Sequence, residues 1–339
     1  MATPDIAQYV LSLGQLFMAG LPGVTLDDST RNLIEEFRIN NFIYFKRNVE
    51  SPEQLKKLSE DLHRVCTQNN LGPPLIAIDQ EGGSVARLAP PFTQFSDARV
   101  LAQSENPENS LSDYASVCSS ELKGIGVNYN LAPVLDVCEA GKEYFMEKRS
   151  LGGDPGVVGR LGTHVIRVMQ AHGIAACAKH FPGLGTAVVD PHFKLPYVAK
   201  PESELRAQDI LPFQQAVAAG VASIMTSHTI YQNLDPESPA TLSKIILTDL
   251  LRNDLGYDGV VITDDLEMGA IEKEGDLGQA ALQAFAAGAD LLLICQSHEK
   301  VIDALGKTGK GIAENPELQA RMQESIRRVT VMRDTFAHS

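Results

Sequence analysis

Two residues with complementary chemistry, Asp190 and His192, stand one residue apart in the chain. Pro191 between them fixes its own φ angle and biases Asp190 toward an extended conformation, so the carboxylate and the imidazole lie within reach of each other. A carboxylate bonded to one ring nitrogen sets the histidine tautomer and leaves the other nitrogen free to carry a proton. The alternative is a polar loop with a hydrogen-bonded histidine, which is the commoner meaning of an isolated Asp-x-His.

The surroundings of this pair favour chemistry over the plain loop. The apolar run Gly173–Ala178 predicts a buried strand, and Lys179 and His180 follow it directly. The next residues break regular structure and predict a loop from there to the pair; they are Pro182, Gly183 and Gly185. Four ionisable side chains therefore follow one buried strand within residues 177–196.

Composition and charge limit the class of protein. The chain has 339 residues, of which 44% are hydrophobic and 21% are charged, as in ordinary soluble globular proteins. Its formal net charge of -14 disfavours nucleic acid and anionic membrane as partners, because no basic field attracts phosphate.

The cysteines and the N-terminal segment bear on the compartment. The five cysteines form no CxxC pair and no zinc spacing, and their odd number suits a reducing compartment better than a disulfide framework. No basic region precedes the apolar segment Tyr9–Gly20, so we expect no signal peptide. No apolar run approaches the roughly 20 residues of a membrane-spanning helix. We therefore expect a cytoplasmic protein.

Eight short apolar runs predict strands, and the stretches between them predict helices. The predicted strands are Gln15–Leu21, Asn41–Phe45, Pro74–Ile78, one within Val127–Val137, Gly173–Ala178, Ser223–Met225, Gly259–Thr263 and Asp290–Cys295. After a short leading helix, the predicted helices include Asp27–Asn40, Ser51–Asn69, Ser110–Gly124, Asp154–His172, Pro201–Ala219, Thr241–Leu255 and Glu274–Ala287. Strands that are hydrophobic throughout are typical of a parallel sheet buried on both faces. This alternation predicts an α/β fold, a (β/α)8 TIM barrel, with residues 1–339 forming a single domain.

An open doubly wound sheet is the structural alternative. It would carry a glycine fingerprint after the first strand, and GLPGVTL at 20–26 is a poor match to GxGxxG. In the barrel, the active site lies at the C-terminal ends of the strands. The polar residues just past the predicted strand ends are Asp79, Glu81, Arg87, Arg149, Lys179, His180, Asp190, His192, His228, Asp264 and Asp265. Each alone has a plain explanation, such as a helix cap or a hydrogen-bonded core histidine, but their concentration on one rim predicts a site.

These segments resemble glycoside hydrolase family 3, and most of all its single-domain bacterial β-N-acetylhexosaminidases. The matching segments follow the family's order: IDQEGGSVARL (78–88), NLAPVLDV (130–137), RSLGGDP (149–155), KHFPGLGTAVVDPHFKLP (179–196), MTSHTIY (225–231) and GVVITDDLEMGA (259–270). Together they span most of the predicted barrel and are highly specific, whereas DQEGG alone would be only moderately so.

The resemblance implies retaining hydrolysis of terminal β-linked N-acetylglucosamine, with no cofactor and no metal. It implies that Asp264 is the nucleophile and that His192, held by Asp190, is the general acid/base. The implied sugar-binding residues are Asp79, Arg87, Arg149, Lys179 and His180. The implied setting is cytoplasmic recycling of cell-wall muropeptides, in which a monomer cleaves N-acetylglucosamine from an anhydro-muramoyl sugar.

The chemistry of the residues agrees with these roles. Retaining hydrolysis needs a carboxylate under the anomeric carbon and a proton donor at the leaving oxygen. Asp264 follows a predicted strand end, which suits the first role, and a histidine that titrates near neutrality suits the second.

Three positions depart from the family pattern. Leu184 stands where the family usually has a second loop histidine, Ser84 where an arginine usually follows DQEGG, and Pro191 where the dyad usually has serine. Leu184 bears on the folded form of the loop, which it can support by packing against Phe181 or Val188. Ser84 bears on a supporting contact near the substrate, and none of the three removes a named catalytic group.

Three other functions stay open. A metal-dependent amidohydrolase barrel would use a similar set of residues, namely Lys179, His180, His192, His228 and Asp264, but it needs a His-x-His on the first strand, and Gln15–Gly23 has no histidine. A non-catalytic sugar-binding relative is suggested by Leu184. Phosphorolysis in place of hydrolysis would use the same nucleophile.

Overall fold

Eight parallel strands form a barrel in the computed structural model, which describes residues 6–142, 144–186, 195–269 and 276–337. The strands are β1 (Phe17–Gly20), β2 (Asn41–Tyr44), β3 (Leu75–Ile78), β4 (Tyr129–Asn130), β5 (Ala175–Phe181), β7 (Ser223–Thr226), β9 (Val260–Ile262) and β10 (Leu292–Ile294). They pair in the order β10-β1-β2-β3-β4-β5-β7-β9. A parallel bridge between Ile262 and Leu291 joins the two ends of this order, so the sheet closes as the predicted (β/α)8 barrel.

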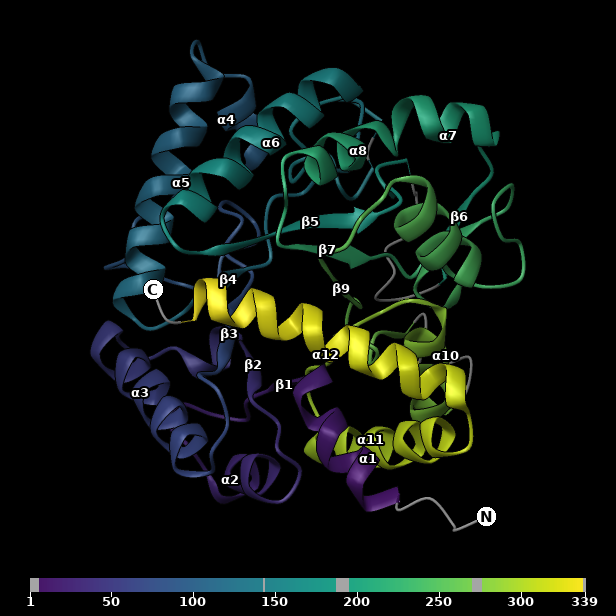
Figure 1. The fold of residues 1–339 in the computed structure, drawn as a ribbon. Helices are drawn as coiled ribbons and strands as arrows, with labels where there is room; N and C mark the ends of the chain where they lie inside the picture. Colours follow the sequence, from purple (N-terminus) through teal and green to yellow (C-terminus); the bar gives the residue numbers. More distant parts are fainter. Residues whose placement is uncertain (1–5, 143, 187–194, 270–275, 338–339) are drawn as a thin grey trace.

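Helices surround the barrel and cover the outer face of its strands, as Figure 1 shows. Every residue of the eight strands is buried, which explains why each strand is nearly all apolar in sequence. The α-helices are α1 (Ile6–Leu13), α2 (Asp28–Glu35), α3 (Pro52–Gln68), α4 (Ala98–Ala102), α5 (Pro107–Gly124), α6 (Pro155–Ala171), α7 (Glu202–Gln208), α8 (Leu211–Ala218), α10 (Leu277–Ala287), α11 (His298–Ala313) and α12 (Pro316–Phe336). Several begin at side chains that accept a backbone N–H of the first turn, among them Asp27, Ser51, Asp154 and Ser297.

Helix α12 crosses the end of the barrel where the strands begin, as Figure 1 shows in yellow. Arg333 donates from Nη2 to the side-chain oxygens of Asn40 and Asn41, at the start of β2, over 3.0 Å in each case. Arg321 and Arg328 of the same helix reach residue 290, just before β10. The helix therefore ties together β10 and β2, which lie on either side of β1 in the barrel.

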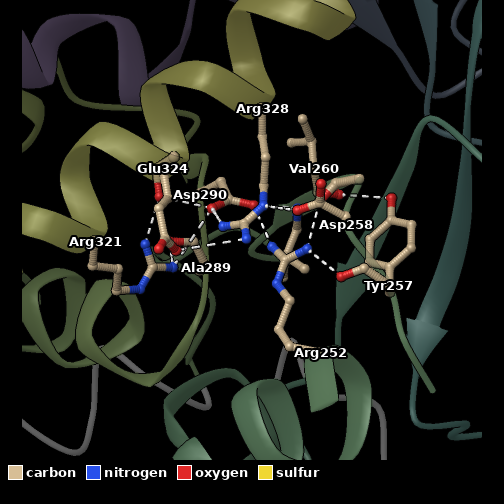
Figure 2. A network of polar contacts seen from close by, with 12 residues as sticks. Arg252, Tyr257, Asp258, Val260, Ala289, Asp290, Arg321, Glu324 and Arg328 are labelled. Atoms are coloured by element: carbon tan, nitrogen blue, oxygen red, sulfur yellow. Dashed lines mark hydrogen bonds and ion pairs between the residues drawn. The ribbon is translucent and has the colours of Figure 1, made fainter. Parts of the chain in front are cut away.

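Residue 290 is a buried aspartate at the centre of the polar network in Figure 2. Asp290 pairs with Arg252, Arg321 and Arg328, and it also accepts from the Ser325 hydroxyl at 2.7 Å and from the Val261 N–H at 2.9 Å. Burial opposes the charge of this carboxylate, but the three arginines outweigh it and hold the pKa of Asp290 below its usual range.

The fifth strand is longer than the sequence predicts. The prediction ended it at Ala178 and placed Lys179 and His180 just past its end, whereas β5 continues to Phe181. The segment after β4 pairs with this extension, since Leu135 N–H donates to Lys179 O at 2.7 Å and Val134 forms a parallel bridge with Lys179. The prediction was wrong because it stopped at the last apolar residue, while a buried strand can carry polar side chains whose charges are paired.

Two predicted helices also differ from those observed. The predicted helix Pro201–Ala219 is two helices, α7 and α8, because Pro212 in the first turn of α8 cannot continue the preceding helix. The predicted helix Thr241–Leu255 is a 3-10 turn, η3 (Ala240–Leu242), followed by a π-helix, η4 (Ile245–Asp254). The first strand also begins later than predicted, after the 3-10 turn η1 (Gly14–Leu16).

A pair of short strands that the sequence did not predict lies beyond the carboxyl ends of the barrel strands. β6 (Tyr197–Val198) and β8 (Ile230–Tyr231) pair in parallel and form a separate two-stranded sheet. A further 3-10 turn, η2 (Lys46–Asn48), follows β2. Among the helices described, none combines the length and the apolar character needed to cross a bilayer.

Candidate active site

A pocket of about 270 Å³ opens at the carboxyl ends of the strands, where the sequence predicts the site. Six of the eight predicted site residues line it: Asp79, Arg87, Arg149, Lys179, His180 and Asp264. The other two, Asp190 and His192, lie outside the described residues. The volume is at the small end of the range for ligand pockets, which suits one sugar ring better than a long chain.

Lys179 is the centre of a buried ion-pair network on the pocket wall. Its side chain is only 2% exposed, and its ammonium donates to Asp79 Oδ1 at 2.8 Å and pairs with Glu81 Oε1 at 2.6 Å. Arg87 pairs with the other oxygen of Asp79 at 2.9 Å. Arg149 holds Glu81 with two bonds, from Nε at 2.8 Å and from Nη2 at 2.7 Å. The two carboxylates are thus held by three cations, which leaves a surplus of positive charge beside the pocket.

The same contacts keep both carboxylates of this network ionised. Burial opposes ionisation of Asp79, but the charges of Lys179 and Arg87 outweigh it and hold its pKa below the usual range. Burial likewise opposes ionisation of Glu81, and Arg149 and Lys179 lower its pKa to about 2. Burial would also lower the pKa of Lys179, but the two carboxylates raise it. Asp79, Glu81 and Lys179 therefore carry their charges at neutral pH.

The guanidinium of Arg87 has one nitrogen with a hydrogen-bond partner and one buried nitrogen without a described partner. Its Nη2 is on Asp79, whereas its Nε is buried and has no hydrogen-bond partner within the described part of the chain. Its guanidinium carbon lies 5.5 Å from the ring centroid of Phe45, which also lines the pocket. A buried donor without a partner costs free energy, so this N–H is suited to receive an acceptor from a ligand.

His180 is held by Asp136, a residue that the sequence analysis did not single out. Asp136 is fully buried, and its Oδ2 lies 2.8 Å from His180 Nδ1. Its Oδ1 accepts the backbone N–H of Leu184 at 2.8 Å and that of His180 at 3.3 Å. One carboxylate therefore orients a pocket histidine and the start of the following loop. Asp136 stands in NLAPVLDV just past the fourth strand, so the rule that found the other acids would have found it too.

Asp264 and Asp265 follow β9, and both line the pocket. Asp264 Oδ1 accepts the N–H of Asp265 at 2.8 Å, which fixes one of its oxygens. Asp265 turns its Oδ1 to the backbone N–H groups of Glu267 at 3.0 Å and Cys295 at 3.3 Å. Burial, helped by the negative charges of Glu267 and Asp264 and opposed by the hydrogen bonds from the backbone, raises the pKa of Asp265 to about 7. The two adjacent acids therefore have different environments.

His228, which the sequence placed on the same rim, is a structural residue. It is fully buried, with Nδ1 2.8 Å from the Thr241 hydroxyl and Nε2 2.9 Å from the carbonyl oxygen of Asp265. A carbonyl only accepts, so Nε2 carries the proton and donates it. The plain explanation, a hydrogen-bonded core histidine, holds at this position.

The departures Leu184 and Ser84 make defined contacts. Leu184 is 2% exposed and packs in a small cluster with Val134, Cys138 and Met146. It is therefore buried, as expected, but Phe181, one of its two expected partners, belongs to a different cluster. The other expected partner, Val188, lies outside the described residues. Ser84 is exposed and bonds Asp97 Oδ1 through its backbone N–H at 2.7 Å and its hydroxyl at 2.9 Å.

Two of the predicted histidines have ring nitrogens bonded within the protein. His180 Nδ1 is bonded to Asp136, and the two ring nitrogens of His228 are bonded to Thr241 and to the carbonyl oxygen of Asp265. Over the residues that the structure describes, no three histidine, cysteine, aspartate or glutamate side chains group as ligands for a metal ion.

The sequence matches one family model over most of its length. The model of the glycosyl hydrolase family 3 N-terminal domain matches residues 11–332. A β-hexosaminidase of Alkalilimnicola ehrlichii is 37% identical over 294 residues, which are 85% of this chain and 82% of that protein. A β-hexosaminidase of Pseudomonas aeruginosa is 32% identical over 306 residues, which are 90% of each chain.

Solved structures of related proteins share the fold. A glycoside hydrolase family 3 β-N-acetylglucosaminidase from Paenibacillus superposes with a TM-score of 0.91 at 38% identity over 97% of this chain, which spans only 62% of that longer protein. NagZ from Neisseria gonorrhoeae, in complex with N-trifluoroacetyl-D-glucosamine, superposes with a TM-score of 0.77 at 27% identity, over 93% of this chain and 98% of that one.

Proposed function

The chain belongs to glycosyl hydrolase family 3 and is a glycoside hydrolase of the β-hexosaminidase kind, and we propose that it hydrolyses terminal β-linked N-acetylglucosamine with retention of configuration. The β-hexosaminidase relatives and the neighbour bound to an N-acylglucosamine analogue support the substrate. The observation that carries the proposal is the pocket itself, in which Asp264 shares one small cavity with Asp79, Arg87 and Lys179.

In the proposed reaction, Asp264 attacks the anomeric carbon and forms a covalent glycosyl-enzyme as the bond to the leaving oxygen breaks. His192 protonates that oxygen, and the same imidazole then takes a proton from the water that hydrolyses the intermediate. Asp190 orients and polarises the imidazole. Asp264 suits its role because it follows a rigid strand end and its carboxylate lines the pocket.

The residues proposed to bind the sugar hydroxyls are Asp79, Arg87, Arg149, Lys179 and His180. Charged groups make stronger hydrogen bonds to hydroxyls than neutral groups do, and their mutual ion pairs hold them in place before the sugar arrives. Arg87 offers its buried, unpartnered Nε. Lys179 and Arg149 also position Asp79 and Glu81, so part of their effect on binding is indirect.

We place the reaction in the cytoplasmic recycling of cell-wall muropeptides, carried out by a monomer in which residues 1–339 act as one domain. The aglycone in that setting is an anhydro-muramoyl sugar. Neither a metal nor a cofactor takes part in the proposed steps, because a carboxylate and a histidine supply both the nucleophile and the proton.

The test is a comparison of rates for an aryl β-N-acetylglucosaminide and the matching aryl β-glucoside. We expect kcat/KM to favour the N-acetyl sugar by at least about 100-fold, because a site built for an amide loses its hydrogen bonds with an analogue that lacks one. Varying phosphate while following sugar 1-phosphate separates hydrolysis from phosphorolysis. Binding without turnover of either substrate would contradict the proposal and favour a sugar-binding relative.

A further inference from the structure

Tyr231 contacts both ends of the segment that contains Asp190 and His192. Its hydroxyl is buried and donates to the carbonyl oxygen of Gly183 at 2.8 Å, where the segment begins. Its own strand, β8, pairs with β6, where the segment ends: Ile230 N–H donates to Pro196 O and Gln232 N–H to Val198 O, both at 3.0 Å. One side chain and one short strand thus join residue 183 to residues 196–198.

Asp209 makes a second connection between the same two ends. It is fully buried at the break between α7 and α8, and its Oδ2 pairs with Lys200 at 2.7 Å. On the other side it lies against Gly183, where a Cβ would come within 2.7 Å of the Asp209 Cβ. Gly183 has a φ of +117°, a conformation that favours glycine, so no larger side chain fits there.

The buried carboxylate of Asp209 is costlier than a purely structural role would require. Its Oδ1 is buried with no hydrogen-bond partner within the described part of the chain, and burial raises the pKa of this carboxyl to about 6 despite Lys200. A buried carboxylate with one ion pair is a costly way to fill space, and an apolar residue of similar size is often as stable or more so. Its placement between Gly183 and Lys200 gives it a role that an apolar residue would not fill.

We propose that Tyr231 and Asp209 are positioning residues for proton transfer: they set the distance between residues 183 and 196–200, the two ends of the segment that contains Asp190 and His192, and proton transfer by His192 depends on that distance. This inference rests on the proposed function and goes beyond it, because neither residue lines the pocket. They act through His192 and touch no substrate.

The test measures kcat/KM of Tyr231→Phe on a substrate with a poor leaving group, methyl β-N-acetylglucosaminide, and on one with an activated leaving group, the 2,4-dinitrophenyl glycoside. The poor leaving group needs a proton in the transition state and the activated one does not. We expect a loss of about tenfold on the methyl glycoside, the scale of one buried hydrogen bond, and less than about twofold on the dinitrophenyl glycoside. Asp209→Asn should show the same selectivity with a smaller loss.

The matched control is Tyr257→Phe. Tyr257 is also buried, and its hydroxyl also donates to backbone carbonyls, those of Val221 and Val260 at 3.3 and 3.2 Å, but it lies at the opposite end of the barrel. We expect this variant to lose stability similar to that lost by Tyr231→Phe, with an unchanged ratio of the two rates.

A double variant separates positioning from general support. If Tyr231 acts through His192, Tyr231→Phe should cause no further loss on the methyl glycoside once His192→Ala is present. Equal losses on both substrates, or additive losses in the double variant, would overturn the inference while leaving the proposed function intact. A wild-type enzyme inactive on both glycosides, or a His192→Ala variant without leaving-group selectivity, would overturn the proposed function and this inference together.

Discussion

The two ends of the barrel each contain a buried carboxylate network with a surplus of cations, but they differ in what the cations leave unbonded. At the amino end, the arginines around Asp290 also donate hydrogen bonds to backbone carbonyls. Arg252 donates to those of Tyr257 and Gly259, and Arg321 donates to that of Ala289. At the carboxyl end, Arg87 keeps a buried Nε with no partner in the described residues, and the cations face a cavity. Figure 2 shows the closed network of the amino end.

The same kind of buried ion-pair network therefore supports stability at the amino end and ligand binding at the carboxyl end. A satisfied network holds elements together, and α12 is held to the barrel in this way. An incompletely bonded network is less stable alone but is ready for a ligand, because a hydroxyl or an amide can complete it. Substitutions at the two ends should therefore change different measurements.

The largest expected effect is on catalysis at the carboxyl end. Asp264→Ala should lower kcat by about 10⁴-fold or more, the scale found when an enzyme loses its nucleophile, while the free energy of unfolding changes little. Trapping with a fluorinated substrate should place the covalent adduct on Asp264 by mass spectrometry. An adduct on Asp265 or Glu267 would show that another acid is the nucleophile.

The next effect is on stability at the amino end. Asp290→Asn removes the buried charge that three arginines share, whose side chains are only 10–15% exposed, and breaking such a group costs about 3–5 kcal/mol. Urea unfolding should show this loss, while kcat of the folded enzyme stays unchanged. The matched control is Asp258→Asn, since Asp258 pairs with Arg327 and Arg328 but its side chain is 64% exposed, so its loss should cost less than about 1 kcal/mol. A fall in kcat without a loss of stability in Asp290→Asn would remove the contrast between the two ends.

The smallest effect concerns Asp265, which lies at the carboxyl end but lacks an ion pair among the described residues. Its pKa is raised to about 7, so the folded state binds a proton more tightly than the unfolded chain. Stability from this group is then fully present below the unfolded pKa, near 4, and is lost as pH rises toward 7. Asp265→Asn should therefore become more stable relative to the wild type between pH 4 and pH 8, in urea unfolding at each pH. A difference that does not vary with pH would contradict the assignment.

The acids of the two networks should behave in the opposite sense. The pKa of Glu81 is about 2, and those of Asp79 and Asp290 are also lowered, so their stabilisation is present above the unfolded pKa values and is lost as pH falls through the folded ones. This loss of stability at acid pH distinguishes the paired carboxylates from Asp265, whose contribution is lost as pH rises, within the same pH series of urea unfolding.

The sequence predicted the barrel well because its strands are apolar on both faces, and such runs stand out against the helices between them. It predicted six residues of the pocket because a parallel barrel brings all strand ends to one rim. It ended the fifth strand before Lys179 and His180, since their pairing with Asp79 and Asp136 comes from segments 44 to 100 residues away. It also placed His228 in the site, because its partners Thr241 and Asp265 are 13 and 37 residues away in sequence.

Asp136 and Tyr231 show what residue types alone do not reveal. Both stand in segments that match the family pattern. Asp136 could have been found, because it is an acid just past the fourth strand, whereas nothing in the type of Tyr231 signals its role. Asp136 differs from other acids only by its three acceptor contacts, and Tyr231 only by the carbonyl that its hydroxyl reaches. Such roles depend on where the chain folds back, and local periodicity does not encode that.

The position of α12 has a consequence for how the protein is made. This helix leaves the ribosome after all eight strands, yet Asn40, Asn41 and Asp290 obtain their arginine partners from it. Until it emerges, a nascent barrel has a buried carboxylate with only Arg252 beside it and the start of β2 uncovered. Contacts across nearly 300 residues form slowly, because a long loop must close first. We therefore expect that a chain interrupted before residue 316 leaves Asn40, Asn41 and Asp290 without these arginine partners.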